Sequence, residues 1–300
     1  MAGTLAYQLF NNGRLKEIEK EAVARLGKCE LCPRKCRVNR LLNEKGVCRI
    51  GRMAMVASFG PHFGEEPPLV GQFGSGTIFF SYCNLLCNFC QNFEISHGGE
   101  GERVNPFELA GIMMDLQKAG CNNINFVTPS HVIPQIIEAV GIALEKGLNV
   151  PLVYNTGGYD EVDSLKLLEG MIDIYMPDFK FWDRDAAQTA CHAPDYPDVA
   201  REAIREMHRQ VGDLVIENGI AVKGLLVRHL VMPEGKAGTR KVARFLSREI
   251  SKETYINIMA QYRPCGNAYE VPWLARRITL QEHDEALQMA REEGLKRIVW

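Results

Sequence analysis

Short apolar stretches alternate with amphipathic helices from Gly74 onward, and this alternation restricts the possible folds more than any other feature of the sequence. Strands that alternate with helices form a parallel sheet built from right-handed βαβ units. Because six repeats are fewer than a closed eight-stranded barrel needs, we expect an α/β fold with an open three-quarter barrel or a doubly wound sheet. The predicted strands are residues 77–82, 123–128, 150–155, 172–178, 222–231 and 255–259.

Two of the predicted helices begin with a complete capping box. Asn105 and Glu108 form one, with a proline between them at the first helical position, and Thr279 and Glu282 form the other. Residues 60–68 are rich in proline and glycine and are predicted to be a loop or linker. The predicted helices are residues 15–26, 105–120, 132–146, 161–168, 197–211, 240–250 and 279–294.

The chain carries a formal charge of −2 over 300 residues, which favours neither nucleic acid nor a membrane surface as a partner. No apolar run reaches the roughly 18 residues of a membrane helix, and the N-terminus lacks the pattern of a secretion signal. We therefore expect a cytoplasmic protein whose ten cysteines stay reduced. Seven of them form two clusters, which indicates metal; Cys121, Cys191 and Cys265 stand alone and are expected to be buried and inert.

One cysteine cluster, Cys83, Cys87 and Cys90, directly follows the first predicted strand. Three thiolates on a short loop can hold three corners of a [4Fe-4S] cluster and leave the fourth iron open to a chelating substrate. Electron carriers normally fill all four corners, and zinc sites usually supply four ligands in paired form, so both alternatives fit less well. The cluster also lies at the carboxyl end of a strand, where α/β folds place their chemistry.

The C-x3-C-x-aromatic-C spacing, with Phe89 as the aromatic residue, resembles the radical S-adenosylmethionine superfamily over about residues 74–259. The resemblance implies a partial (β/α)6 TIM-like barrel in residues 73–300, preceded by a helix and a small cysteine-rich metal-binding segment in residues 1–72. It also implies an oxidoreductase that reductively cleaves S-adenosylmethionine to a 5′-deoxyadenosyl radical, which takes a hydrogen atom from a substrate. Cys90-Gln91-Asn92 and His97-Gly98-Gly99 resemble the activating enzymes of glycyl radical enzymes, such as that of pyruvate formate-lyase.

Asp178 and Lys180 close the fourth predicted strand and, being two residues apart, point to the same face. They resemble the D-x-K motif of the activating enzymes, which implies contact with S-adenosylmethionine; a surface ion pair is the alternative. Arg228 lies in an apolar strand and needs an anionic partner, either a ligand carboxylate or a neighbouring acidic residue.

Asn155 follows the third strand, in a turn similar to one found in activating enzymes, and is a further cofactor candidate. The superfamily usually has a G-G-E-type stretch after the second strand. This chain has Thr128-Pro129-Ser130-His131 there, so Thr128 and Ser130 are the candidates for the amino-group contact. The sixth strand is followed by Gln261-Tyr262-Arg263-Pro264 in place of the usual histidine, which indicates a different substrate or cofactor contact.

The other cysteine cluster offers four thiols within twenty residues, enough for a closed metal site with zinc or an auxiliary [4Fe-4S] cluster. Five arginines and one lysine lie around these cysteines, where charged residues usually form a solvated surface; the alternative is a basic patch that receives an acidic electron donor, such as flavodoxin or ferredoxin, or an anionic substrate. The four cysteines are Cys29, Cys32, Cys36 and Cys48, and the basic residues are Arg34, Lys35, Arg37, Arg40, Arg49 and Arg52.

Three substrate classes remain open: a glycyl radical enzyme, another protein or peptide, and a small molecule. The competing non-enzyme prediction is an iron–sulfur electron-transfer protein, which requires four ligands for each cluster and no binding of S-adenosylmethionine.

Overall fold

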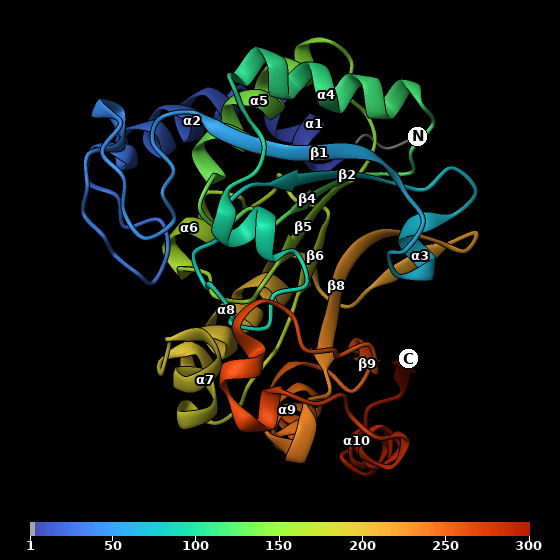
Figure 1. The fold of residues 1–300 in the computed structure, drawn as a ribbon. Helices are drawn as coiled ribbons and strands as arrows, with labels where there is room; N and C mark the ends of the chain where they lie inside the picture. The colour runs from blue at the N-terminus through green and yellow to red at the C-terminus, as the bar shows by residue number, and fades with distance from the viewer. Residues whose placement is uncertain (1–3) are drawn as a thin grey trace.

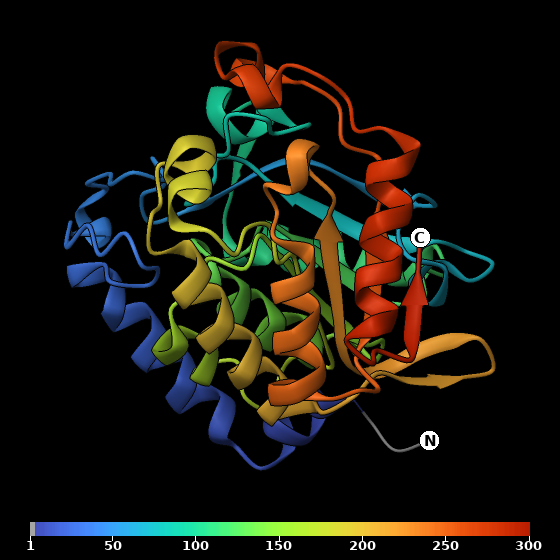
Figure 2. The same ribbon diagram turned by 90° about the horizontal axis from the view of Figure 1, so that it is seen from below.

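A computed structural model describes residues 4–300, whose strands form one large curved sheet with helices outside it (Figures 1 and 2). The sheet order is β10-β9-β8-β6-β5-β4-β2-β1-β3, with β7 paired to β8. The strands are β1 (Ala54–His62), β2 (Ser75–Phe80), β3 (Glu102–Val104), β4 (Ile124–Val127), β5 (Leu152–Thr156), β6 (Ile174–Pro177), β7 (Val215–Glu217), β8 (Ile220–Leu230), β9 (Tyr255–Met259) and β10 (Arg297–Val299). The helices are α1 (Leu5–Asn11), α2 (Arg14–Ala24), α3 (Pro67–Val70), α4 (Pro106–Lys118), α5 (Ile133–Glu145), α6 (Val162–Lys166), α7 (Arg184–Cys191), α8 (Tyr196–Val211), α9 (Thr239–Phe245) and α10 (Leu280–Glu292).

The six predicted strands correspond to β2, β4, β5, β6, β8 and β9, and each is parallel to the next. β1 joins β2 antiparallel at one side and β10 joins β9 at the other, so the described sheet is a partial barrel. The predicted α/β partial barrel is therefore confirmed. Since the strands are parallel, their carboxyl ends meet at one rim.

Both predicted capping boxes are present, and they fix where α4 and α10 begin. The Asn105 side chain accepts from the backbone N–H of Glu108, whose carboxylate accepts from Asn105 in return. Thr279 and Glu282 do the same. The predicted helix over 240–250 is α-helical as α9 only to Phe245 and continues as a π-helical turn to Ile250.

The prediction of a loop over 60–68 is wrong at both ends. β1 extends through His62 and pairs with β2 over its whole second half, and α3 begins at Pro67. Pro61 is tolerated because β3 pairs only with the start of β1, at Ala54–Val56, so the missing N–H of Pro61 lies on a free edge. Local composition could not reveal this strand, because its partner lies beyond the next turn.

The N-terminal residues share the hydrophobic core of the barrel. Leu15 and Ala22 of α2 and Val56 of β1 are buried in the same cluster as Ile78 and Phe126 from the sheet. The segment is thereby fixed against the barrel through both a helix and a strand. No helix among residues 4–300 has the length and apolarity needed to cross a membrane.

Two buried histidines make stability sensitive to acid. Burial lowers the pKa of His131 and that of His229 to about 4. Because the folded pKa lies below the unfolded value near 6.5, the stabilisation is present above pH 6.5 and is lost as the pH falls toward 4. Urea titrations measure how far the free energy of unfolding falls between pH 7 and pH 5. We expect this fall to be about 2 kcal/mol smaller in His229→Gln than in wild type. Equal losses in the two proteins would contradict this assignment.

Candidate active site

A cavity of about 440 Å³ opens where the carboxyl ends of the parallel strands meet. Every one of the six strands contributes to its wall, either by its last residues or by the loop that follows. The lining includes Phe79 and the cysteine loop after β2, Val127 and Thr128 at β4, Asn155 and Thr156 of β5, Asp178 after β6, Arg228 and Leu230 of β8, and Met259 and Gln261 at β9.

The three thiols of the cysteine loop, Cys83, Cys87 and Cys90, all line this cavity. The backbone N–H of Leu85 donates to the Cys83 sulfur at 3.3 Å, which orients that thiol. Burial raises the pKa of Cys83 to about 12 and also raises that of Cys90. Such thiols become thiolates only beside a strong positive charge, so the donor set fits iron.

Across the cavity, Asp178, Lys180 and Arg228 form a buried ionic network. The Asp178 carboxylate accepts from Lys180 Nζ at 2.6 Å and from Arg228 Nε at 2.8 Å. Burial alone would raise the pKa of Asp178, but the charges of Arg228 and Lys180 lower it below its usual range. Burial would likewise lower the pKa of Lys180, and the Asp178 charge raises it instead. All three side chains are therefore charged.

Two carboxylates near this network were not predicted from the sequence. Glu65 and Glu66 lie 3.8 and 3.9 Å from the Arg228 guanidinium, and each keeps one buried oxygen without a hydrogen-bond partner. Burial raises the pKa of Glu65. Three carboxyl groups thus face the two cations Lys180 and Arg228, and the unpartnered oxygens of Glu65 and Glu66 can accept from a ligand. No local signal marked them, because they lie in the passage predicted to be a linker.

Of the five remaining predicted cofactor residues, four line the cavity and one does not. Phe89, Asn92, Thr128 and Asn155 line it. Phe89 packs edge-on against Phe181 and Tyr262, and Asn155 accepts from Arg228 at 2.7 Å. Ser130 is buried behind the rim, where its hydroxyl bonds to Thr156 at 3.0 Å, and it does not belong to the lining.

Cys191 was expected to be inert, but it contacts the cysteine loop. It is fully buried, and its sulfur lies 3.4 Å from that of Cys87. The shared hydrogen bond and burial raise the pKa of Cys87. Only the fold brings these thiols together, since 104 residues separate them. Cys121 is buried as expected, and Cys265 is half-buried.

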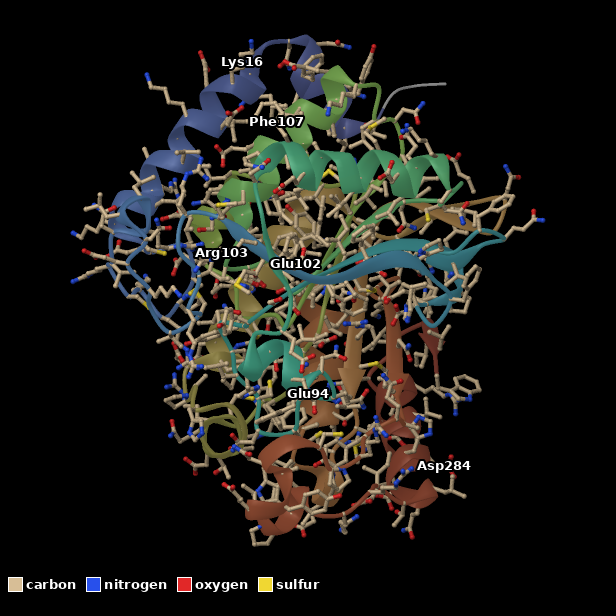
Figure 3. The ribbon with its side chains drawn as sticks, turned by 45° about the horizontal axis from the view of Figure 1, so that its top comes forward. Lys16, Glu94, Glu102, Arg103, Phe107 and Asp284 are labelled. Atoms are coloured by element: carbon tan, nitrogen blue, oxygen red, sulfur yellow. The ribbon has the colours of Figure 1, made fainter. Side chains whose placement is uncertain are left out.

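Of the residues that resembled activating enzymes, His97 and Gly99 have a local structural role. His97 belongs to a π-helical turn that also carries Glu94 (Figure 3), and its ring stacks on Phe93 at 4.1 Å. Gly99 has a φ of +72°, and a Cβ there would lie 2.1 Å from the Tyr82 ring. The turn therefore packs closely beneath Tyr82, immediately before Cys83.

The four N-terminal cysteines lie together around a separate small cavity, and most of the cations near them have partners within the protein. Five of these six cations are bound within the protein: Arg34 and Arg40 donate to backbone carbonyls, and Lys35, Arg37 and Arg52 pair with Glu161, Glu30 and Glu138. Within residues 4–300, no group of three or more His, Cys, Asp or Glu side chains is set to hold a metal ion. In both clusters the cysteines surround a space and do not converge on one point.

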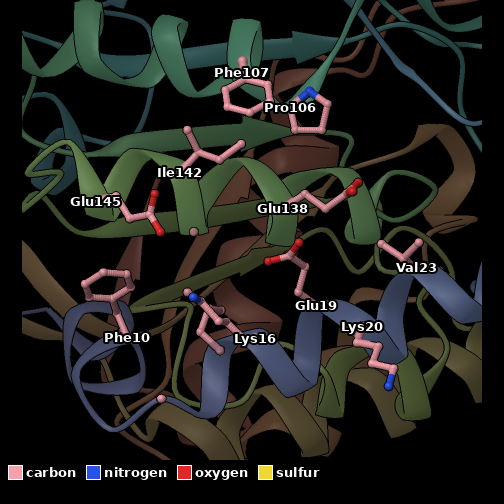
Figure 4. Close-up of a pocket in the computed structure, with 13 residues that line it drawn as sticks. Phe10, Lys16, Glu19, Lys20, Val23, Pro106, Phe107, Glu138, Ile142 and Glu145 are labelled. Carbon is pink, nitrogen blue, oxygen red and sulfur yellow. The ribbon is translucent and has the colours of Figure 1, made fainter.

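A larger cavity, of about 680 Å³, lies between α2, α4 and α5 (Figure 4). Its polar lining consists of Lys16, Lys20, Glu19, Glu138 and Glu145, with no cysteine or histidine. Lys16 and Phe107 of this cavity are well separated from Glu94 beside the cysteine loop (Figure 3). We therefore place the candidate active site at the strand rim.

Known structures share this fold. A radical SAM methyltransferase from Sphaerobacter thermophilus aligns with 75% of this chain at a TM-score of 0.52 and 15% identity. HydG, a maturase of the [FeFe]-hydrogenase, aligns with 74% at a TM-score of 0.51 and 14% identity. The alignments span 65% and 50% of those two chains. The chain thus has the fold of radical SAM enzymes.

Sequence comparison identifies the family. No model of a known protein family matches the chain. The uncharacterized protein MJ0674 of Methanocaldococcus jannaschii is 33% identical over 277 residues, which cover 89% of this chain and 75% of that protein. With this identity over most of both sequences, the chain belongs to the same protein family as MJ0674.

Proposed function

We propose that the protein is a radical S-adenosylmethionine enzyme, with a [4Fe-4S] cluster on Cys83, Cys87 and Cys90. The observation that carries the proposal is the shared cavity. Three thiols and the network of Asp178, Lys180 and Arg228 line the same 440 Å³ space at the carboxyl ends of the parallel strands. The loop supplies three thiolates, so one iron would remain available to S-adenosylmethionine.

When bound, the cluster and S-adenosylmethionine would supply one-electron cleavage of the cofactor's C5′–S bond. The protein's own residues bind and orient. Lys180 and Arg228 present positive charge to a carboxylate, whereas Asp178 and Glu65 present negative charge to an ammonium or sulfonium group. Because these charges are already held in place, the ligand meets a preorganised site.

The apolar part of the wall keeps water from the reacting atoms. Leu85, Phe89 and Tyr262 line the cavity beside the cysteines, and all three are buried. Phe181 packs behind Phe89 at 5.8 Å and holds its ring in place. A radical site needs such shielding, because the protein's part in this chemistry is orientation and exclusion of competing reactions.

The substrate we favour is a polypeptide, which includes the glycyl radical enzyme predicted from the sequence. The cavity rim is exposed at Gln91, Asn92 and Gln261, and Phe63, between the cavity residues His62 and Gly64, is 63% exposed. Exposed aromatic side chains are typical of protein interfaces. Incubation with pyruvate formate-lyase, S-adenosylmethionine and dithionite tests the finer prediction through the glycyl-radical EPR signal. Absence of the signal would direct the search to other polypeptides.

The experiment that tests the proposed function is anaerobic reconstitution with iron and sulfide, followed by dithionite and S-adenosylmethionine. We expect 5′-deoxyadenosine and methionine to form; flavodoxin or ferredoxin is the predicted natural donor. No 5′-deoxyadenosine from protein with an intact cluster would overturn the proposal and favour an electron-transfer protein.

Cys191 gives a further prediction within this function. If Cys87 binds iron as a thiolate, Cys191 keeps its proton. The Cys191 thiol then donates a hydrogen bond to the Cys87 sulfur, 3.4 Å away. Such a hydrogen bond stabilises the reduced, more negative cluster. We expect Cys191→Ala to lower the midpoint potential of the cluster by roughly 20–60 mV in an EPR-monitored redox titration. An unchanged potential would mean that the contact is only packing, and Cys121→Ala is the matched control, since Cys121 is buried but lines neither cysteine cavity.

A further inference from the structure

The four N-terminal cysteines surround a small enclosed cavity that belongs to no part of the site described above. Its volume is about 10 Å³, roughly the space of one water molecule. Two buried basic side chains, Arg40 and His131, complete the wall. The thiols are those of Cys29, Cys32, Cys36 and Cys48.

The backbone around these cysteines is arranged to stabilise sulfur anions. The N–H of Val47 donates to the Cys36 sulfur at 3.4 Å, and backbone N–H groups of Arg34 and Ile50 donate to Cys32 and Cys48. In the last two cases the donor lies two residues after the cysteine. The same spacing occurs at the other cluster, where Leu85 donates to Cys83 and Asn92 to Cys90. Both clusters thus share one local design.

Arg40 supplies an independent observation that points to a ligand. Its side chain is 1% exposed; Nη1 donates to the His131 carbonyl at 2.8 Å and lies 3.7 Å from the Cys29 sulfur. Nη2 is buried without any hydrogen-bond partner. His131 donates from Nε2 to the Ser81 carbonyl, so its unpartnered Nδ1 is an acceptor and Arg40 is the group that points to an anion. A buried guanidinium with an idle donor requires an anion, and the other polar groups lining this cavity are thiols.

Among the described residues the four sulfurs surround this space without converging on one point, as they would have to around a single ion. A zinc ion draws four thiolate sulfurs to about 2.3 Å from its centre, which leaves no opening the size of a water molecule among them. A cubane cluster holds its cysteine sulfurs farther apart. The Gly46 backbone packs directly against Cys36 and helps to enclose this space. A larger residue would not fit, because a Cβ at position 46 would lie 2.6 Å from the Cys36 sulfur.

We infer that Cys29, Cys32, Cys36 and Cys48 ligate a second iron–sulfur cluster of the [4Fe-4S] type, with Arg40 balancing its negative charge. All four irons then have a cysteine ligand, so this cluster is closed to S-adenosylmethionine. The inference does not depend on the proposed function, because the site is separate and its metal can be counted without turnover.

The second cluster lies directly against the polypeptide that carries the first. Arg34, between Cys32 and Cys36, donates to the carbonyls of Asn84 and Leu85 in the first cysteine loop, at 2.9 and 3.1 Å. It also donates to the carbonyls of Cys191 and His192. One side chain therefore ties the N-terminal segment to both the loop and α7.

Metal analysis of the anaerobically reconstituted protein tests the inference. We expect about eight irons and eight sulfides per wild-type chain, and about four of each in the Cys83→Ala/Cys87→Ala/Cys90→Ala variant. The variant Cys32→Ala/Cys48→Ala should lose about half of the iron, whereas Cys121→Ala should lose none. One zinc per wild-type chain would overturn the inference, as would a Cys83→Ala/Cys87→Ala/Cys90→Ala variant that binds no iron. About four irons in wild type that all remain in this variant would support the inference and contradict the proposed function. If the variant fails to fold, about eight irons in wild type support the inference and one zinc per chain overturns it.

Arg40 provides a second measurement. Replacement by methionine removes a cation from beside a dianionic cluster, so we expect the midpoint potential of the second cluster to become more negative, with the first cluster's potential unchanged. Arg49→Met, in the same segment, is the control and should move neither potential. A potential that stays the same in Arg40→Met would contradict the assigned role of this side chain.

Discussion

Replacement of Cys83 by alanine is expected to reduce 5′-deoxyadenosine formation by more than about a hundredfold. Loss of groups that merely support a metal ligand costs up to about a hundredfold in affinity or activity, and a direct ligand costs more. Cys83 is held toward the cavity by the Leu85 N–H, and no other thiol lines the cavity besides Cys87 and Cys90. Cys191 lies against Cys87 but outside the lining, so the variant has no further thiol in the cavity wall to replace Cys83. The measurement is product formation per chain, alongside iron content.

Cys121→Ala is the matched control for this prediction. Cys121 is 2% exposed and lines neither cysteine cavity, so its loss tests whether removing any buried thiol impairs the protein. We expect this variant to keep its iron and its activity. A Cys83→Ala protein that still forms 5′-deoxyadenosine at the wild-type rate would show that the cluster is held elsewhere.

Arg228→Met is expected to destabilise the fold by about 3–5 kcal/mol, the usual cost of removing one partner from a buried ion pair. The guanidinium is the cation that Asp178, Glu65 and Glu66 have in common. Without it, Asp178 keeps only Lys180, and the glutamates lose their nearest positive charge. Methionine preserves most of the side-chain volume, so the effect is one of charge more than of packing.

Urea unfolding at neutral pH measures this effect. Lys166→Met is the control, because Lys166 pairs with Asp163 at 3.0 Å on the surface and is 54% exposed. Exposed pairs contribute about 0–1 kcal/mol. If Arg228→Met loses no more unfolding free energy than Lys166→Met, the buried ionic network does not stabilise the fold.

The repeating part of the fold was predictable from sequence because its signals are local. Strands such as β4 and β5 are short apolar runs between turns, and capping boxes announce α4 and α10 within four residues. The position of the loop that carries Cys83, Cys87 and Cys90 was also predictable, because this loop directly follows β2. Asp178 and Lys180 were found because strand alternation places them on one face.

Features that depend on distant partners were missed. β1 is a strand because β2 and β3 pair with it, and its Gly60-Pro61 sequence indicates a turn. The contact between Cys191 and Cys87 exists only once α7 has packed beside the cysteine loop. Ser130 illustrates the reverse case: its position after β4 predicted a cavity contact, yet its hydroxyl turns inward to Thr156.

The basic N-terminal segment shows how charge composition can mislead. Basic residues near the N-terminal cysteines were compatible with a docking surface, but Arg34 and Arg40 donate hydrogen bonds to carbonyls inside the protein. These two side chains therefore do not offer their charge to a docking partner.

The central claim is that the Cys83, Cys87 and Cys90 cluster has an iron open to S-adenosylmethionine. The most direct test is the EPR spectrum of the dithionite-reduced protein, recorded with and without S-adenosylmethionine under anaerobic conditions. We predict that the cofactor changes the signal of one cluster in wild type, and that the Cys83→Ala/Cys87→Ala/Cys90→Ala variant shows no change. Identical wild-type spectra with and without the cofactor, at full iron content, would contradict the account.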